Sequence, residues 1–269
     1  MWPALSPSHS TLVAPFQPTG KFIFFDVGSV IIDLDWDSFH LSLQSYFEKP
    51  EHFDFEKFAR KAKDVDIARK WSTGAIGPAE YTRLFLHCLG ASESPNQTQK
   101  VKSTSSLVVG PVRMRVLRLI KKLRQLHFGL GVLSNATPWH ETDIEATISL
   151  KNHFDLVVFS QDYGCEKPEP SIYEKSFSDA RDLMLKTRNI KLEPQDVLFL
   201  DDTPANVIAA QNEGWNARLV ALLKEDDHQL FLKNKLEANI LAEKSKNSKN
   251  LIFGDEAAKR VESLFQNFF

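Results

Sequence analysis

Four separate stretches of this 269-residue chain carry polar side chains that could act together on a phosphate ester. They are Asp26, Ser134, Lys167 and the pair Asp201-Asp202. A carboxylate can attack phosphorus, and two or three carboxylates can hold a Mg²⁺ ion that offsets the charge of phosphate oxygens. A lysine and a hydroxyl group can bind the remaining oxygens. Together these residue types predict a phosphate site with a carboxylate nucleophile.

Taken singly, each of these residues also has an ordinary structural explanation. Asp26 could cap the turn that follows it, Ser134-Asn135 could cap a helix, and Asp201-Asp202 before Thr-Pro could be an N-cap pair. Lys167 before a proline is the pattern of a solvated surface lysine. The prediction therefore depends on whether the fold brings the four stretches to one place.

The stretch from Lys21 to Asp35 indicates how the fold could do so. Phe22–Phe25 is a continuous apolar run, which is typical of a strand covered on both faces. The run stops at Asp26, and Gly28 and a second apolar run at Val30–Ile32 follow. In open α/β sheets, ligands bind at the carboxyl edge of the strands, where Asp26 would lie.

Strands and helices alternate from Pro111 to residue 220, which predicts βαβ units and a doubly wound, Rossmann-like parallel sheet. The expected helices are Pro111–His127, one that begins near Pro168–Pro170, and Ala205–Asn212, which Gly214 closes. The expected strands are Leu130–Leu133, Phe154–Phe159, Asp196–Leu200 and, as the last one, Ala217–Val220. Ser134, Lys167 and Asp201 each lie at or just beyond the end of one of these strands.

Residues 36–105 interrupt this alternation and are helical and aromatic in character. Phe39, Leu43, Tyr46 and Phe47 recur at helical spacing, a second helix is expected over Asp54–Lys70, and Pro78 suits the first turn of a third. The polar stretch Ala91–Ser106 is interpreted as a connection. The pattern predicts an all-helical module inserted after the first strand.

The remaining features limit the possible functions. The net charge of −2 gives no basic surface for nucleic acid or membrane, and no apolar run reaches the roughly 18–20 residues that span a bilayer. Residues 1–20 are interpreted as a mobile tail without a targeting signal, which favours the cytoplasm. Residues 221–269 are expected to form a helical extension, with helices over Lys224–Lys246 and Asp255–Phe268. Cys88 and Cys165 are expected to be buried thiols.

Four short motifs in this order resemble those of the haloacid dehalogenase-like hydrolase superfamily, over roughly residues 20–220. The motifs are Phe24–Val30, Val132–Asn135, Lys167–Tyr173 and Phe199–Asn206. Trp71–Tyr81 is similar to a segment of the helical cap that these enzymes insert after the first motif. The resemblance therefore implies that residues 21–35 and 106–220 form the core and that residues 36–105 form the cap.

The resemblance also implies a role for each matched residue. Asp26 would be the nucleophile that forms an aspartyl-phosphate. The phosphate would be bound by the Ser134 hydroxyl, the Asn135 backbone N–H and Lys167. The Mg²⁺ ligands would be Asp26, Asp201, Asp202 and the backbone carbonyl of Gly28, with Asn206 orienting the acidic pair. The expected substrate is a small phosphorylated metabolite.

One position departs from the pattern of most phosphatases in the superfamily. They carry a second Asp, two residues after the nucleophile, as general acid and base, and this chain has Gly28 there. General acid–base catalysis typically contributes about 10²–10⁴-fold. A subgroup of sugar-phosphate and nucleotide-type phosphatases resembles this chain in having glycine at that position. Two further readings stay open: a catalytically silent binding or regulatory protein, and a 2-haloacid dehalogenase, which needs neither a metal nor an acidic pair.

Overall fold

The computed structural model describes residues 19–92, 97–221 and 251–253. Its centre is a six-stranded sheet in the order β5-β4-β1-β6-β7-β8, and every strand pair in it is parallel. The strands are β1 (Phe22–Phe25), β4 (Gly129–Ser134), β5 (Leu156–Phe159), β6 (Val197–Asp201), β7 (Asn216–Ala221) and β8 (Leu251–Phe253). The chain runs outward from β1 through β4 to β5 and then returns to β6 on the other side of β1. This reversal is the doubly wound topology that the sequence predicts, and ligands bind beside such a reversal.

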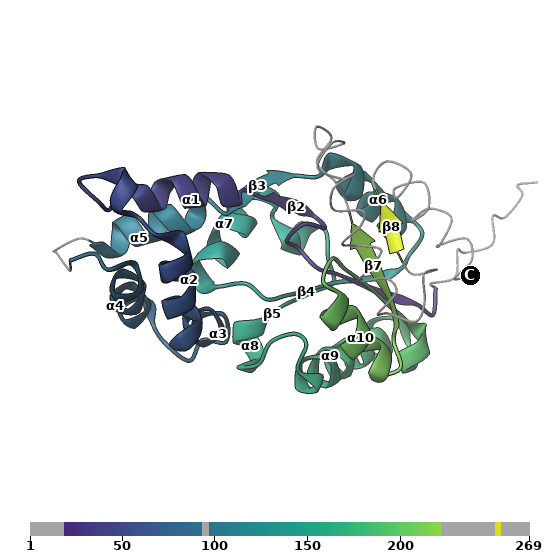
Figure 1. Cartoon of the computed structure of the whole chain (residues 1–269). Coiled ribbons are helices and arrows are strands. Elements are labelled where there is room, and N and C mark those ends of the chain that lie inside the picture. The colour runs from purple at the N-terminus through teal and green to yellow at the C-terminus, as the bar shows by residue number, and fades with distance from the viewer. Residues whose placement is uncertain (1–18, 93–96, 222–250, 254–269) are drawn as a thin grey trace, which may run out of the picture.

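Helices cover both faces of the sheet (Figure 1). Residues alternate between the faces along β1, so Ile23 and Phe25 pack with α6 (Met114–Gln125) and α7 (Pro138–Ile148). Phe22 and Phe24 pack on the opposite face, with α9 (Pro170–Arg188) and α10 (Pro204–Asn212). The short elements between them are η2 (Leu150–Asn152), α8 (Ser160–Tyr163) and η3 (Pro194–Asp196). Because β1 is buried on both faces, its continuous apolar sequence is the one that a central parallel strand requires.

An all-helical module lies at the other end of the molecule from this sheet (Figure 1). It consists of α1 (Trp36–Gln44), η1 (Pro50–His52), α2 (Phe55–Asp64), α3 (Ile67–Ser72), α4 (Pro78–Leu89) and α5 (Gln97–Ser106). Its own hydrophobic core includes Leu43, Trp71 and Phe85, and Trp139 of α7 joins that core from the sheet side. Two short antiparallel strands, β2 (Ile32–Leu34) and β3 (Val109–Val112), lead the chain into the module and out of it.

Three boundary predictions in and beside the module are wrong. Asp54–Lys70 is two helices, because Asp66 adopts a left-handed conformation with φ of 52° between α2 and α3. Ala91–Ser106 is not only a connection: Gln97–Ser106 forms α5, whose Val101 and Thr104 are buried although most of the helix is polar. The helix expected from Pro111 begins at Met114, since residues 109–112 pair with β2 instead.

The C-terminal prediction is also wrong in part. Residues 221–269 were expected to be helical, with Ala217–Val220 as the last strand, but Leu251–Phe253 form β8 and pair with β7. Three apolar residues are too short a pattern to distinguish a strand from a helical segment. Residues 1–18 of the predicted tail and both helices, over Lys224–Lys246 and Asp255–Phe268, lie outside the described residues.

The structure also bears on the two cysteines and on membrane-spanning helices. Cys88 and Cys165 are both buried free thiols, as expected. Among the described residues, we find no helix with the length and apolar character needed to cross a membrane.

Candidate active site at the carboxyl end of the sheet

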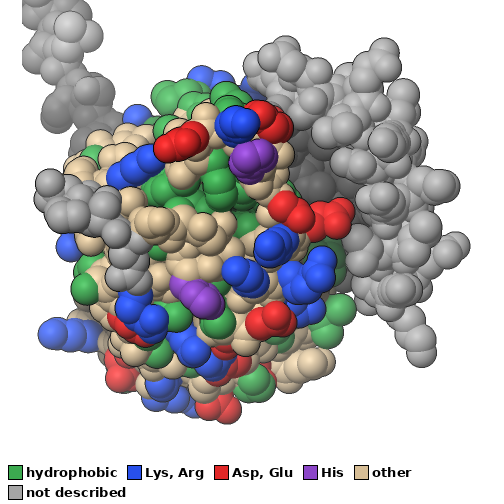
Figure 2. All heavy atoms as spheres, turned by 60° about the vertical axis from the view of Figure 1, so that its left-hand side comes forward, with side chains coloured by type: hydrophobic (Ala, Val, Ile, Leu, Met, Phe, Trp, Pro, Cys, Tyr) green, Lys and Arg blue, Asp and Glu red, His purple; other side chains and the backbone are tan. Residues whose placement is uncertain are grey.

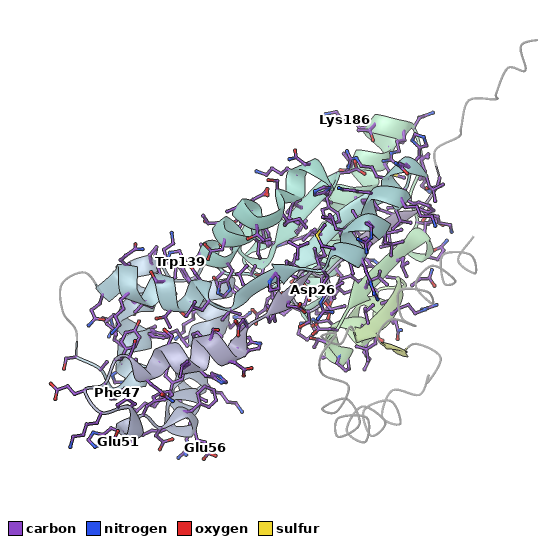
Figure 3. All side chains as sticks on the ribbon, turned by 90° about the horizontal axis from the view of Figure 1, so that it is seen from above. Asp26, Phe47, Glu51, Glu56, Trp139 and Lys186 are labelled. Carbon is purple, nitrogen blue, oxygen red and sulfur yellow. The ribbon has the colours of Figure 1, made fainter. Side chains whose placement is uncertain are left out.

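Asp26 follows the last residue of β1, in the middle of the sheet. Its backbone N–H donates to the carbonyl oxygen of Leu200 at 2.9 Å, so the strand ladder holds Asp26 beside the end of β6. The Val27 backbone N–H donates to Asp26 Oδ1 at 2.7 Å and fixes the carboxylate orientation. The side chain is almost completely buried. Figure 3 shows Asp26 toward the middle of the molecule, between the sheet helices and the module.

Lys167 connects two of the predicted carboxylates. Its Nζ lies 3.0 Å from Asp26 Oδ1 and 2.6 Å from Asp201 Oδ2, and only 1% of its side chain is exposed. Asn135 holds the lysine backbone from both sides: its Nδ2 donates to the Lys167 carbonyl oxygen at 2.8 Å, and its Oδ1 accepts from the Lys167 N–H at 2.9 Å. The prediction gave Asn135 a role through its backbone alone, and its side chain adds this positioning contact.

Asp201 ends β6 and is completely buried. Besides Lys167, its carboxylate accepts hydrogen bonds from the Thr203 N–H at 2.8 Å and from Asn206 Nδ2 at 3.0 and 3.2 Å. Asn206 is itself held in place, because the Tyr173 hydroxyl donates to its carbonyl oxygen at 3.0 Å. The predicted contact between Asn206 and the acidic pair is therefore present, and it is made to Asp201.

Asp202 is half-buried and lines a cavity that Asp26 also lines. Ligand oxygens of Asp26, Asp201 and Asp202 all lie within 4.8 Å of one another. Burial, only partly offset by Lys167, raises the pKa of Asp26 to about 7, and burial followed by the charge of Asp201 raises the pKa of Asp202. Burial alone would lower the pKa of Lys167, but Asp26 and Asp201 outweigh it and leave that pKa raised.

The charge balance of this cluster indicates a cation site. Three carboxylates face a single lysine, so two negative charges are uncompensated in a largely buried place, which is unfavourable without a cation. The donor set consists of hard oxygen atoms, which suit Mg²⁺ or Ca²⁺ and not a soft metal. The residues present therefore fit the group that the sequence predicts.

Ser134 and Gly28 complete the predicted set. Ser134 is the last residue of β4, is buried, and lines the same cavity as Asp26, Asn135 and Lys167. Gly28 also lines this cavity, two residues beyond Asp26. The structure thus brings every predicted site residue to one edge of the sheet, and among them only Asp201 does not line the cavity.

The cavity has a volume of about 640 Å³ and extends from these residues to the helical module. Residues of α1, α2, α3 and α4 form its far wall. Two contacts join the module to the loop that carries Lys167: Arg69 Nη2 lies 2.7 Å from Glu169 Oε1, and the Ser72 hydroxyl donates to Glu166. The sequence analysis did not predict these contacts between the module and the loop. The glutamates on either side of Lys167-Pro168 were the signal in the sequence that could have indicated them.

The comparisons with known proteins agree with this geometry. Residues 99–220 match the sequence profile of a family described as haloacid dehalogenase-like hydrolase, and they contain three of the four motifs. Over these residues the chain is similar to haloacid dehalogenase-like hydrolases. The remaining motif precedes the matched region and contains Asp26, directly after the central strand β1.

One curated relative is the Rhythmically expressed gene 2 protein of Drosophila melanogaster, 31% identical over 104 residues, which are 38% of this chain and 37% of that protein. The chain thus spans little more than a third of the length of that relative. Among solved structures, a family enzyme of Bacteroides thetaiotaomicron in complex with magnesium and inorganic phosphate has a TM-score of 0.59 at 22% identity, covering 78% of this chain and 98% of that one. A 2-haloacid dehalogenase of Pseudomonas syringae has a TM-score of 0.52 at 17% identity, covering 74% and 86%. At these identities the likeness shows the fold.

Proposed function

We propose that the protein is a Mg²⁺-dependent phosphatase that hydrolyses a small phosphorylated metabolite through an aspartyl-phosphate on Asp26. The observation that carries the proposal is the contact between Lys167 Nζ and both Asp26 and Asp201, in a cavity that Ser134 and Asp202 also line. The similar Bacteroides enzyme, described in complex with magnesium and inorganic phosphate, supports the same assignment.

The ligands of Mg²⁺ would be Asp26, Asp202 and the backbone carbonyl of Gly28, with Asp201 adjoining them. Asp202 faces the cavity, whereas both oxygens of Asp201 already accept hydrogen bonds from Lys167, Asn206 and Thr203. Asp201 therefore chiefly positions Lys167 and contributes negative charge to the cation site. When bound, the cation offsets the charge of the phosphate oxygens and of the carboxylates around it.

The protein's own residues would carry out the reaction in two displacements at phosphorus. Lys167 and the Ser134 hydroxyl bind phosphate oxygens, and the Val27 N–H keeps Asp26 aligned. One Asp26 oxygen attacks phosphorus, the bond from phosphorus to the ester oxygen breaks, and the leaving oxygen takes a proton from water. A water molecule then attacks the same phosphorus, the bond to Asp26 breaks, and inorganic phosphate and the free carboxylate result.

Lys167 also affects the ionisation of Asp26 before the first displacement. The nucleophile must be ionised, and burial raises the pKa of Asp26 to about 7. Lys167 opposes that shift through its charge and its hydrogen bond. We therefore expect Lys167 to keep the nucleophile ionised as well as to bind phosphate.

The proposal is tested with a panel of phosphorylated metabolites, assayed for phosphate release with and without Mg²⁺. We expect turnover of at least one ester that depends on Mg²⁺, and no turnover in Asp26→Asn. The matched control is Asp37→Asn, which changes an acidic residue of α1 that does not line the cavity. Phosphate release by Asp26→Asn at the wild-type rate would refute the mechanism.

Gly28 favours two alternatives that the same panel separates. A silent binding protein would bind Mg²⁺ and phosphate without turning over any ester. A haloacid dehalogenase would release chloride from 2-chloropropionate without Mg²⁺, and the Pseudomonas dehalogenase shares the fold. The acidic cluster and its buried lysine are the features that favour the phosphatase over both.

A further inference from the structure

The far wall of the active-site cavity is aromatic. Trp36, Phe39, His40 and Phe55 lie along it and contact one another, with ring centroids 5.8 Å apart for Trp36 and Phe39 and 4.2 Å apart for His40 and Phe55. Trp36 and Phe55 are 49% and 40% exposed, unusually high values for large apolar side chains. Hydrophobic side chains are visible between charged ones on the module end of the molecule in Figure 2. The group that occupies the cavity must therefore offer apolar surface to these rings.

The wall provides almost no charge for a second anionic group on the substrate. Among the described residues that line the cavity, the permanently cationic side chains are Lys167 and Arg69. Lys167 is held by Asp26 and Asp201, and Arg69 by Glu169. Burial lowers the pKa of His140, whose Nε2 lies 3.0 Å from the Ser105 carbonyl oxygen, so this ring is a neutral donor.

Polar side chains of the wall are also poorly placed to serve the many hydroxyl groups of a sugar. The Ser72 hydroxyl donates to Glu166. A buried hydroxyl group without a partner is unfavourable, so a wall of this kind selects against a polyol. The phosphate end of the cavity is polar and the far end is not.

Among the described residues that line the cavity, two buried polar atoms lack a hydrogen-bond partner, Trp71 Nε1 and Ser105 Oγ. Trp71 is 1% exposed and lines the cavity, and no described residue accepts a hydrogen bond from its Nε1. Buried tryptophan N–H groups normally have a hydrogen-bond acceptor. The Trp71 ring itself is held by stacking on Tyr81, with centroids 4.9 Å apart, and by an edge contact with Trp139.

From these observations we infer the substrate class: a phosphate monoester whose organic part is a planar aromatic ring system with a hydrogen-bond acceptor and no second anionic group. The phosphate lies at Asp26 and Lys167, the ring packs against Trp36, Phe39 and Phe55, and the acceptor meets Trp71 Nε1. A cavity of about 640 Å³ holds such a molecule. This inference rests on the proposed phosphatase function and adds the identity of the leaving group to it.

The first test compares esters of similar leaving-group chemistry, so that differences report binding. Naphthylmethyl phosphate, coumarin-4-ylmethyl phosphate, glucose 6-phosphate and glycerol 3-phosphate are all esters of primary alcohols. We expect kcat/KM for the two aromatic esters to exceed that for glucose 6-phosphate by about tenfold or more, the effect of contact with large aromatic side chains. Equal or higher kcat/KM for the sugar ester would overturn the inference and leave the phosphatase proposal intact. Failure to turn over any of these esters, and also the acyl phosphate acetyl phosphate, with Mg²⁺ present would refute both.

The second test uses variants of the exposed wall residues, which are not expected to disturb folding. Trp36→Ala and Phe55→Ala should each lower the ratio of kcat/KM for naphthylmethyl phosphate to that for glycerol 3-phosphate by roughly tenfold. Leu41→Ala is the matched control, because Leu41 lies on the same helix as Trp36, is 68% exposed and does not line the cavity. Unchanged ratios in both wall variants would overturn the inference.

The third test concerns Trp71 Nε1. Trp71→Phe keeps an aromatic ring but removes the N–H donor. It should lower kcat/KM for the coumarin ester, which carries a carbonyl acceptor, relative to the naphthyl ester by about 3–10-fold, the range of a single hydrogen bond. An unchanged ratio between these two esters would contradict the role of Trp71 as the donor.

Discussion

Replacing Gly28 by Asp would place a carboxylic acid two residues beyond the nucleophile, where most phosphatases that the chain resembles carry one. The backbone permits this change, because Gly28 is not among the residues with positive φ. A Cβ atom built on Gly28 would lie 3.3 Å from Leu34 Cδ1 and 3.4 Å from Leu34 Cδ2. Both are side-chain atoms that a small rotation can move.

The structure therefore predicts a modest stability cost and a larger catalytic gain. Moving the Leu34 side chain by a few tenths of an ångström should lower the free energy of unfolding by about 1 kcal/mol, at the low end of overpacking. A positioned general acid contributes about 10²–10⁴-fold to the rate, or roughly 3–5 kcal/mol of barrier. The gain should be large for alkyl esters, whose leaving oxygen needs a proton, and small for aryl esters with an acidic leaving group.

The assay is the Mg²⁺-dependent rate of phosphate release from an alkyl and an aryl ester by wild type, Gly28→Asp and Gly28→Asn. Asn has the shape of Asp but cannot donate a carboxylic proton, so it separates acid catalysis from altered packing. We expect that only Gly28→Asp accelerates phosphate release from the alkyl ester. If Gly28→Asp and Gly28→Asn behave alike on both esters, position 28 is not where the missing acid belongs.

Three further predictions concern the supporting structure. Asn206→Leu removes two hydrogen bonds to the buried Asp201 carboxylate. It should lower the free energy of unfolding by about 1.5–3 kcal/mol in a denaturant titration and lower the affinity for Mg²⁺ about 10–100-fold. No change in either quantity would argue against a positioning role for Asn206. Burial lowers the pKa of His140 from 6.5, so the stability that neutral His140 gives to the fold is complete above pH 6.5 and is lost as pH falls toward the folded-state pKa. His140→Gln should therefore flatten the pH dependence of the free energy of unfolding below pH 6.5. An equally steep decline in the variant would contradict this. Gly131→Ala should lower the free energy of unfolding by about 1–3 kcal/mol, because its Cβ would lie 2.6 Å from Phe24 Cε1, whereas Gly77→Ala, with no atom within 4 Å, should change it little.

Much of the core could be predicted from the sequence, because local patterns there agree with the global fold. The apolar run Phe22–Phe25 is continuous since β1 is covered on both faces, and polar residues end β1, β4 and β6 at a common edge. Parallel strands necessarily present these ends together, so the convergence of Asp26, Ser134 and Asp201 followed from strand order alone.

The helical module was less predictable, because its boundaries depend on tertiary contacts. The break between α2 and α3 occurs at Asp66, whose left-handed backbone conformation is not predicted by an aspartate in the sequence. The polar helix α5 is stabilised by contacts with α4 and α7. The aromatic wall of the cavity shows the same limit. Trp36 and Phe39 closely follow the first motif, but plain packing was the favoured interpretation from the sequence, and the folded arrangement places them on the wall of the cavity that Asp26 also lines.

The most direct test of the account is a single-turnover experiment quenched in acid, followed by mass analysis of the proteolytic peptides. We expect one phosphoryl group on the peptide containing Asp26, present only with Mg²⁺ and absent in Asp26→Asn. Release of phosphate without that modified peptide, or a phosphoryl group on a different residue, would contradict it.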